Sequence, residues 1–271
     1  MVSPIIICDG VIRSGSTWSF NVCRLLGQLL AERRCETPIS QYLDEQQLDQ
    51  FLRAEAYLCK GPAIIKGHVT GPLALEWIRT GRAKAVCTFR DPRDCVASDL
   101  AFFAGGFNIS VNRVNTSLAS LASYLDFGRT LFVRYEDMME DRPNQIRRIA
   151  AHLNVAIDQK VLERIDDQTN IHSARKIARQ LASRADDQID VVLNSHRRDI
   201  KTLLHDNHIG TGKVGKWKHD LTDEQGQYLT RLFRRSLITL GYETEASIQA
   251  IGPESPAPGA TSSDSISAPP C

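Results

Sequence analysis

Residues 9–18, with the sequence DGVIRSGSTW, are the stretch that most constrains the fold of this chain. They follow four apolar residues, 5–8, that lack any polar alternation, as is typical of a strand buried on both faces of a parallel sheet. Gly10 and Gly15 stand five residues apart, which lets the backbone turn tightly and approach a ligand closely. A helical pattern follows, so backbone amides and the positive helix end are expected to face an anion. We interpret the stretch as a phosphate-binding loop.

One position separates this loop from that of a nucleotide triphosphatase. The spacing matches G-x-x-x-x-G-K-[ST], but Ser16 stands where those proteins carry a lysine. That lysine reaches the β and γ phosphates, so the pattern speaks against a conventional ATP or GTP site, although Arg13 supplies a cation three residues earlier. Ser16 or Thr17 is expected to cap the helix. The alternative is a glycine-rich strand-to-helix turn without a ligand.

The composition excludes several classes of protein. A formal net charge of +1 at pH 7 gives no overall attraction to nucleic acid or to a membrane, so any preference for anions must be local. No apolar run approaches the roughly 18 residues of a membrane span, and no basic leader precedes the first strand. We therefore expect a cytoplasmic protein. The seven cysteines form no C-x-x-C pair, which favours reduced, packed thiols, and His205 and His208 have no metal-binding partner at a familiar spacing.

Short apolar runs alternate with amphipathic segments along the chain. Strands are expected near 5–8, 62–66, 85–89 and 130–135, and helices near 18–33, 44–58, 73–80, 110–126, from 143, and after a capping box at Thr222 and Gln225. Residues 158–205 are expected to be helical. The alternation predicts one α/β domain, residues 1–251, with a central parallel β-sheet flanked by helices. Residues 252–271 are rich in Pro, Ser, Ala and Gly and are expected to form a disordered tail.

Polar side chains stand where the predicted strands end, which is the edge where parallel sheets bind ligands. Asp91 and Pro92 end one strand and start a helix, as N-cap and first helical residue. Arg90, Asp94 and Ser98 are four residues apart and therefore share one face, where an arginine and a hydroxyl suit a phosphate. The alternative is that Arg90 pairs with Asp91 or Asp94 and that Ser98 only packs.

His68 closes another predicted strand, and Lys66 precedes it by two residues, so both side chains point the same way. A histidine is the usual general base near neutral pH, and an adjacent cation stabilises developing negative charge. A purely structural histidine is the alternative.

Five short motifs in one order resemble the sulfotransferases that use 3'-phosphoadenosine 5'-phosphosulfate (PAPS). They are RSGSTW (13–18), KGH (66–68), FRDPRD (89–94) with Ser98, VRYEDM (133–138), and GKVGKWK (212–218) before Leu221 and Thr222. The resemblance extends over roughly residues 5 to 240. It implies a P-loop-like fold and transfer of a sulfuryl group to a hydroxyl or amine of a small-molecule or glycan acceptor, with no metal and no nucleic acid.

The resemblance also assigns roles to individual residues. It implies that the loop binds the donor, that Trp18 lies on the adenine, that Arg90 and Ser98 hold the 3' phosphate and that Tyr135 lies beside the base. The residues expected to bind the donor are Arg13, Ser14, Gly15, Ser16, Thr17, Trp18, Arg90, Ser98, Tyr135, Gly212 and Lys213. Catalysis falls to His68 as the base, assisted by Lys66, and to Arg13 at the bridging oxygen of the leaving group.

The last loop departs from the family pattern. Residues 210–212 read GTG where the family commonly has Arg-Lys-Gly. Either backbone amides and Lys213 replace those cations, or the donor binds more weakly. Two other functions stay open at this point: a small-molecule kinase or nucleotide hydrolase, and a non-catalytic protein that senses a nucleotide or binds a partner. The first needs a lysine and Mg²⁺, and the second has no use for Lys66, His68 and Arg13.

Overall fold

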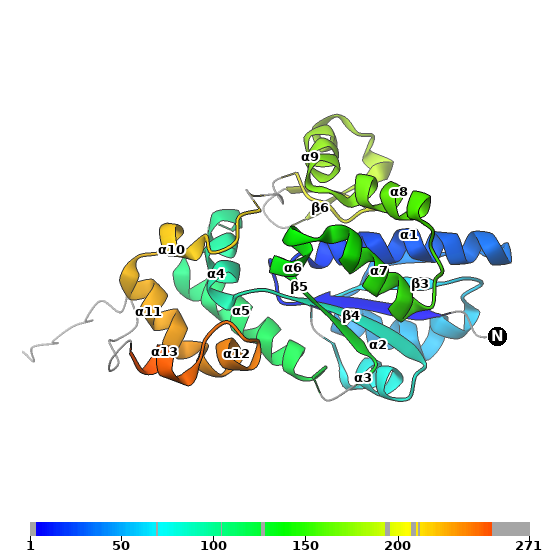
Figure 1. Ribbon diagram of the computed structural model, residues 1–271. Helices are drawn as coiled ribbons and strands as arrows, with labels where there is room; N and C mark the ends of the chain where they lie inside the picture. The colour runs from blue at the N-terminus through cyan, green and yellow to red at the C-terminus, as the bar shows by residue number, and fades with distance from the viewer. Residues whose placement is uncertain are drawn as a thin grey trace, which may run out of the picture.

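A parallel five-stranded sheet forms the centre of the molecule (Figure 1). The computed structural model describes residues 4–68, 70–103, 105–125, 128–192, 196–206, 210 and 212–250. The strands are β1 (Ile5–Gly10), β2 (Ile39–Tyr42), β3 (Ala63–Lys66), β4 (Ala83–Phe89) and β5 (Thr130–Arg134). Their order is β2-β3-β1-β4-β5, and every neighbouring pair is parallel. The predicted α/β fold with a central parallel sheet is thus confirmed.

Helices occupy most of the remaining described chain. They are α1 (Ser16–Arg34), α2 (Glu45–Gln50), α3 (Pro72–Arg79), α4 (Pro92–Phe102), α5 (Phe107–Ala122), α6 (Tyr135–Glu140), α7 (Arg142–Leu153), α8 (Gln159–Thr169), α9 (Ile171–Gln180), α10 (Trp217–Asp220), α11 (Asp223–Leu232), α12 (Arg234–Thr239) and α13 (Glu245–Gln249). A π-helical stretch, Phe51–Glu55, and 3-10 turns at Ala56–Leu58, Leu181–Ser183 and Asp186–Gln188 complete the set.

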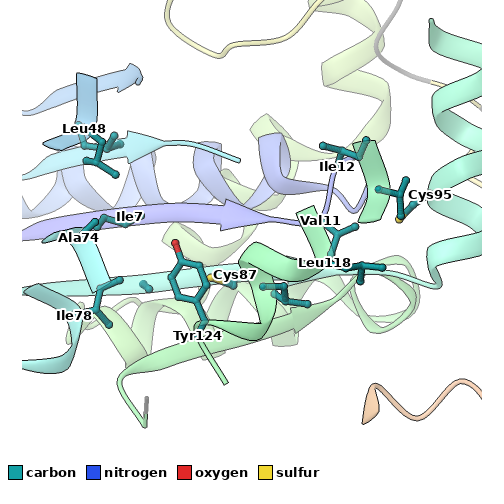
Figure 2. Close-up of a cluster of buried hydrophobic side chains, with 14 of the residues drawn as sticks. Ile7, Val11, Ile12, Leu48, Ala74, Ile78, Cys87, Cys95, Leu118 and Tyr124 are labelled. Carbon is teal, nitrogen blue, oxygen red and sulfur yellow. The ribbon is translucent and has the colours of Figure 1, made fainter. Parts of the chain in front are cut away.

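Alternate residues of β1 pack into two hydrophobic cores, one on each face of the sheet. Ile5 and Ile7 pack with side chains from α2, α3, α5, α11 and α12, and Figure 2 shows part of this cluster around β1. Ile6 and Cys8 pack on the other face with α1, α6, α7 and α8, which lie over the sheet in Figure 1. A continuous apolar run is therefore required in β1, because both of its faces are buried.

Two elements differ from the sequence-based expectations. Strand β2 was not predicted, since all four of its residues are half-buried and it sits at the edge of the sheet. The expectation of helix throughout 158–205 is wrong in its last part, where β6 (Ile189–Val192) pairs antiparallel with β7 (His196–Asp199). Leu125 and Leu232 are each 45 % exposed, because they lie at or beyond the ends of α5 and α11.

The local start signals of the helices are confirmed. Asp91 caps α4 with Pro92 at its first position, and Thr222 with Gln225 forms the predicted capping box of α11. Four cysteines, Cys8, Cys23, Cys87 and Cys95, are buried as small apolar residues. None of the helices in the described ranges is long and apolar enough to cross a membrane. The predicted tail, 252–271, lies outside the described residues, as do His208 and Thr211.

Candidate active site

One cavity of about 490 Å³ opens at the carboxyl ends of β1, β3 and β4. Its lining contains every residue that the sequence assigned to the site except Ser14. The parallel strands explain this convergence, since each strand delivers its last residues to the same edge of the sheet. Further lining residues come from α8, α9 and β7, which cross above that edge.

The phosphate-binding loop is held against the neighbouring strand β4. Gly10 lies so close to Thr88 that an added Cβ would stand 2.3 Å from the Thr88 hydroxyl and 2.5 Å from its carbonyl oxygen. The Ser14 hydroxyl lies 2.6 Å from the Thr88 hydroxyl and donates to the Val11 carbonyl at 2.5 Å. Ser14 is fully buried and points away from the cavity. Its side chain therefore shapes the loop and does not reach a ligand.

Helix α1 begins at the cavity without a capping side chain. The N-cap is Gly15, with a φ of 88°, so the expectation that Ser16 or Thr17 caps the helix is wrong. No acidic residue lies in the first turn. Because the first amides of a helix lack intrahelical partners, this end carries partial positive charge into the cavity. A bound phosphate group is the chemistry that such an end favours.

Arg13 projects from the loop between two side chains of α4. Its Nε donates to the Ser98 hydroxyl at 3.2 Å, and its guanidinium carbon lies 4.2 Å from the centre of the Phe102 ring. Burial lowers the pKa of Arg13 to about 10, so the side chain stays charged at neutral pH. Ser98 is therefore engaged with the loop cation in this structure, whereas the sequence grouped it with Arg90.

Arg90 pairs with Asp94, which was the alternative that the sequence left open. Its Nη2 lies 2.9 Å from Asp94 Oδ2 and 2.8 Å from the Lys213 carbonyl oxygen, and its guanidinium carbon lies 4.1 Å from the centre of the Tyr135 ring. The pairing does not remove Arg90 from the cavity, which it lines together with Tyr135.

Asp94 also holds the last loop, a role that the sequence did not reveal. Its two carboxylate oxygens accept the backbone amides of Gly215 and Trp217, each at 2.8 Å. Tyr135 adds a bond from its hydroxyl to the Gly212 carbonyl at 3.4 Å. The only signal in the sequence was the spacing of four between Arg90 and Asp94. It could not indicate a partner more than 120 residues away.

Several buried polar atoms of residues that line the cavity have no hydrogen-bond partner among the described residues. Nε1 of Trp18 and Nε of Arg90 are two of them, and Nε of Arg113 and Nε of Arg198 are two more. Buried donors are normally paired, and an orphaned one at a cavity is typical of a position that a ligand completes.

His68 and Lys66 form a directly bonded pair at the end of β3. Lys66 Nζ lies 2.9 Å from His68 Nε2, and His68 Nδ1 lies 3.4 Å from the Gly10 carbonyl oxygen. Burial, followed by the charge of Lys66, holds the pKa of His68 well below 6.5, so its ring is neutral at pH 7. Burial lowers the pKa of Lys66 to about 8, against the charge of Asp9, which raises it. A neutral imidazole thus stands beside an ammonium group.

A buried carboxylate network supports this pair from beneath. Asp9 is 2 % exposed and accepts from the Thr70 hydroxyl at 2.6 Å, the Tyr124 hydroxyl at 2.8 Å and the Gly10 amide at 2.6 Å. Figure 2 shows Tyr124 with its hydroxyl directed at β1. No pattern in the sequence predicts this network, because Tyr124 lies 115 residues from Asp9 and neither forms a recognisable motif.

Known proteins match the chain over most of its length. A family model described as "Sulfotransferase domain" matches residues 3–241. "Amine sulfotransferase" of Oryctolagus cuniculus is 22% identical over 199 residues, covering 65% of this chain and 62% of that protein, which is less than two thirds of its length. "Sulfotransferase 1C2" of Homo sapiens is 20% identical over 258 residues, covering 83% of this chain and 80% of that protein.

Solved structures share the fold. A mouse sulfotransferase complexed with PAP superposes with a TM-score of 0.62 and 14% identity, covering 93% of this chain and 88% of the other. A retinol dehydratase in complex with androsterone and PAP gives 0.57 and 17%, covering 86% and 80%. The family match runs from β1 to the end of α12. The protein therefore belongs to the sulfotransferase family, whose enzymes take sulfuryl groups from PAPS.

Proposed function

We propose that the domain of residues 1–251 transfers the sulfuryl group of PAPS to a hydroxyl or amine of an acceptor and releases adenosine 3',5'-bisphosphate (PAP). The observation that carries the proposal is that one cavity joins the start of α1 and Arg13 to the His68–Lys66 pair. An anion held at α1 is thereby placed next to a neutral base and two cations.

Donor binding follows from the groups described above. The first amides of α1 would bind the 5' phosphate, and Arg90 with Ser98 would bind the 3' phosphate. The orphaned indole N–H of Trp18 and the ring of Tyr135 would border the adenine. PAPS supplies an activated sulfuryl group that needs no γ phosphate contact, which is consistent with Ser16 in place of a lysine.

Proton transfer would fall to His68. Its Nδ1–H donates to the Gly10 carbonyl, which leaves the Nε2 lone pair as the basic site. Nε2 takes the acceptor's proton as the acceptor oxygen or nitrogen attacks sulfur. Lys66, now bonded to Nε2, would turn to the sulfuryl oxygens, where negative charge is exposed. Arg13 stabilises the charge that collects on the leaving phosphate.

The neighbours bound to small molecules suggest the kind of acceptor. Retinol dehydratase has been solved with androsterone and with retinol, in each case together with PAP. We propose that this chain likewise binds a small hydroxylated molecule within the aromatic side of its cavity, near Tyr42, Phe102 and Phe103.

The central test is transfer of labelled sulfate from PAPS to a panel of phenols, alcohols, amines and sugars. His68→Ala is expected to lower turnover at least about 100-fold, because a positioned base contributes that much or more. PAP affinity, measured by calorimetry, should stay unchanged in the same variant. His219→Ala, which changes an exposed histidine outside the cavity, serves as the matched control.

The same experiment separates the other functions. Tight PAP binding by the wild-type protein without transfer to any acceptor would favour a non-catalytic nucleotide binder. ATP binding that depends on Mg²⁺ would favour a kinase or hydrolase. Normal turnover in His68→Ala would remove the histidine from the mechanism.

A further inference from the structure

The formally charged side chains in the described lining of the cavity are all basic. The lining contains eight basic side chains and, among the residues that the structure describes there, no aspartate or glutamate: Arg13, Lys66, Arg90, Arg113, Arg142, Arg198, Lys213 and Lys216. A donor with two phosphate positions and a sulfuryl group accounts for those near α1 and the last loop. It does not account for Arg113 and Arg198, which come from α5 and β7.

Arg198 lies on the His68 side of the cavity. Its guanidinium carbon is 5.5 Å from the centre of the Tyr42 ring, and Lys66 Nζ is 5.7 Å from the same ring. The Tyr42 and His68 ring centres are 6.3 Å apart. Arg198 is therefore a neighbour of the proposed base, separated from it by one aromatic ring.

Arg113 also lines the cavity, and its guanidinium group packs on an aromatic ring. Its guanidinium carbon is 3.9 Å from the centre of the Phe103 ring, which packs edge-on against Phe102 at 4.4 Å. Phe102 in turn carries Arg13 on its face at 4.2 Å. Phe102 and Phe103 therefore lie between Arg113 and Arg13, and both arginines line the cavity together with Tyr42.

Each of these arginines is held by a carboxylate that does not line the cavity. Arg113 Nε lies 3.4 Å from Asp99 Oδ2, and Arg198 Nη2 lies 2.8 Å from Asp190 Oδ2. Nε of Arg198 is buried and has no hydrogen-bond partner among the described residues. The acidic partners orient the two guanidinium groups from outside and leave donors for a ligand.

The charges of these cations also act on the bases beside them. Burial first, and then the charges of Arg198, Lys66 and Arg13, lower the pKa of His205 to about 4. Arg113 contributes to the lowered pKa of His68, and Arg198 to that of Lys66. An acceptor entering this space meets positive potential before it meets the base.

We propose that the acceptor is itself an anion: a hydroxyl or amine compound carrying a carboxylate, phosphate or sulfate group that binds between Arg113 and Arg198. Its apolar part would lie on Tyr42, Phe102 and Phe103. A neutral acceptor would displace water from both arginines without forming a charge-assisted hydrogen bond to either of them. An anionic group would form such a bond to each arginine. This inference rests on the proposed sulfotransferase function, since it names the substrate class of the same site.

Binding of matched ligand pairs to the PAP-saturated protein tests the proposal. One pair is 4-hydroxyphenylacetate and its methyl ester, and the other is p-nitrophenyl glucuronide and p-nitrophenyl glucoside. The charged member of a pair is expected to bind at least about tenfold tighter, and the preference should shrink as salt rises from 0.05 to about 0.3 M. Arg198→Gln should abolish most of the preference, and Arg198→Lys should retain part of it because the charge remains.

Arg79→Gln is the matched control, because Arg79 forms an exposed pair with Glu76 far from the cavity lining. Arg198 is a suitable test position, since its partner Asp190 is partly exposed and no buried charge is left behind. Thermal unfolding checks that the variants fold. Equal binding of charged and neutral members, no binding of either pair, or the same preference in Arg198→Gln and Arg79→Gln overturns the anionic acceptor.

Failure of this inference can be told apart from failure of the proposed function. If PAP binds and sulfate is transferred preferentially to neutral acceptors, the sulfotransferase function stands and the anionic acceptor is wrong. If PAP does not bind, the proposed donor site fails. The ligand pairs measured without nucleotide then still report whether Arg113 and Arg198 form an anion site.

Discussion

Lys66 carries its positive charge in a buried position, where the charged form of a side chain is disfavoured. It is 4 % exposed, and burial alone would favour the neutral amine. The charge of Asp9 works against that loss, so the pKa of Lys66 settles at about 8. The Thr70 and Tyr124 hydroxyls in turn stabilise the Asp9 carboxylate. The buried Asp9 carboxylate thus helps to keep the buried Lys66 side chain protonated.

We predict an alkaline limb in kcat/KM with an apparent pKa near 8. Lys66 loses its proton as pH rises through that value, and the cation at the sulfuryl group disappears. No acidic limb is expected near pH 6.5, because the pKa of His68 lies well below that value. Lys66→Arg should move the alkaline limb upward, since an arginine does not titrate in this range.

Asp9→Asn should move the same limb to lower pH by about one unit, because it removes the charge that raises the pKa of Lys66. Kinetics from pH 5.5 to 10 measure the effect. An unchanged limb in this variant would show that Asp9 acts only in packing.

The junction between β1 and α1 is the element that the rest of the site depends on. At Gly10 its backbone lies so close to Thr88 of β4 that no side chain fits there. The Ser14 hydroxyl is hydrogen-bonded to the hydroxyl of the same threonine. The loop is thereby held in position by the sheet and not by a ligand. This arrangement favours a donor site that exists before the donor arrives.

Gly10→Ala is expected to destabilise the protein by about 3 kcal/mol, because the new methyl group must displace the backbone of Thr88. Urea unfolding measures the loss. Gly128→Ala is the control, since a Cβ there meets nothing within 4 Å, and its change should stay within about 0.5 kcal/mol. Similar losses in both variants would contradict the close approach.

The last loop depends on α4 through Asp94. Asp94→Asn is expected to weaken PAP binding roughly tenfold, about 1.4 kcal/mol, because one charged partner of Arg90 and one carboxylate acceptor are lost. Faster amide exchange over residues 213–217 should accompany the loss. Asp223→Asn, an exposed acid at the start of α11, is the control. Unchanged exchange in Asp94→Asn would show that other contacts hold the loop.

At the scale of the whole molecule, Arg93 connects the sheet domain to the C-terminal helices. Its guanidinium lies 2.7 Å from Asp91 Oδ2 and Glu243 Oε1, and 3.1 Å from the Thr230 hydroxyl, with its guanidinium carbon 4.2 Å from the Trp217 ring centre. Figure 1 shows α10–α13 gathered beside α4 and α5. One buried arginine thus joins the start of α4 to three places in the C-terminal part of the chain, at Trp217, Thr230 and Glu243.

Arg93→Ala should cost about 3 kcal/mol of unfolding free energy, because removal of one partner leaves Asp91 buried without its cation. Arg79→Ala removes an exposed pair with Glu76 and should cost no more than about 1 kcal/mol. Chemical denaturation compares the two. Equal losses would mean that the Arg93 cluster adds no more than a surface pair.

The order of strands and helices could be predicted because each signal is local. Apolar runs buried on both faces, Asp91 with Pro92, and Thr222 with Gln225 act within a few residues and survive folding unchanged. Strand β2 and the β6–β7 strand pair could not be predicted, because their described residues are mostly partly exposed and their pairing depends on a neighbouring strand.

The same division holds at the site. The sequence by itself determined which groups reach the carboxyl edge of the sheet: Arg13, Lys66, His68 and Arg90 follow from strand ends, since parallel strands finish side by side. Three outcomes required the folded chain: Ser14 turns inward, Asp94 holds the last loop, and Arg113 and Arg198 line the same cavity as His68. Those outcomes depend on contacts between residues tens to more than a hundred positions apart, which no local pattern encodes.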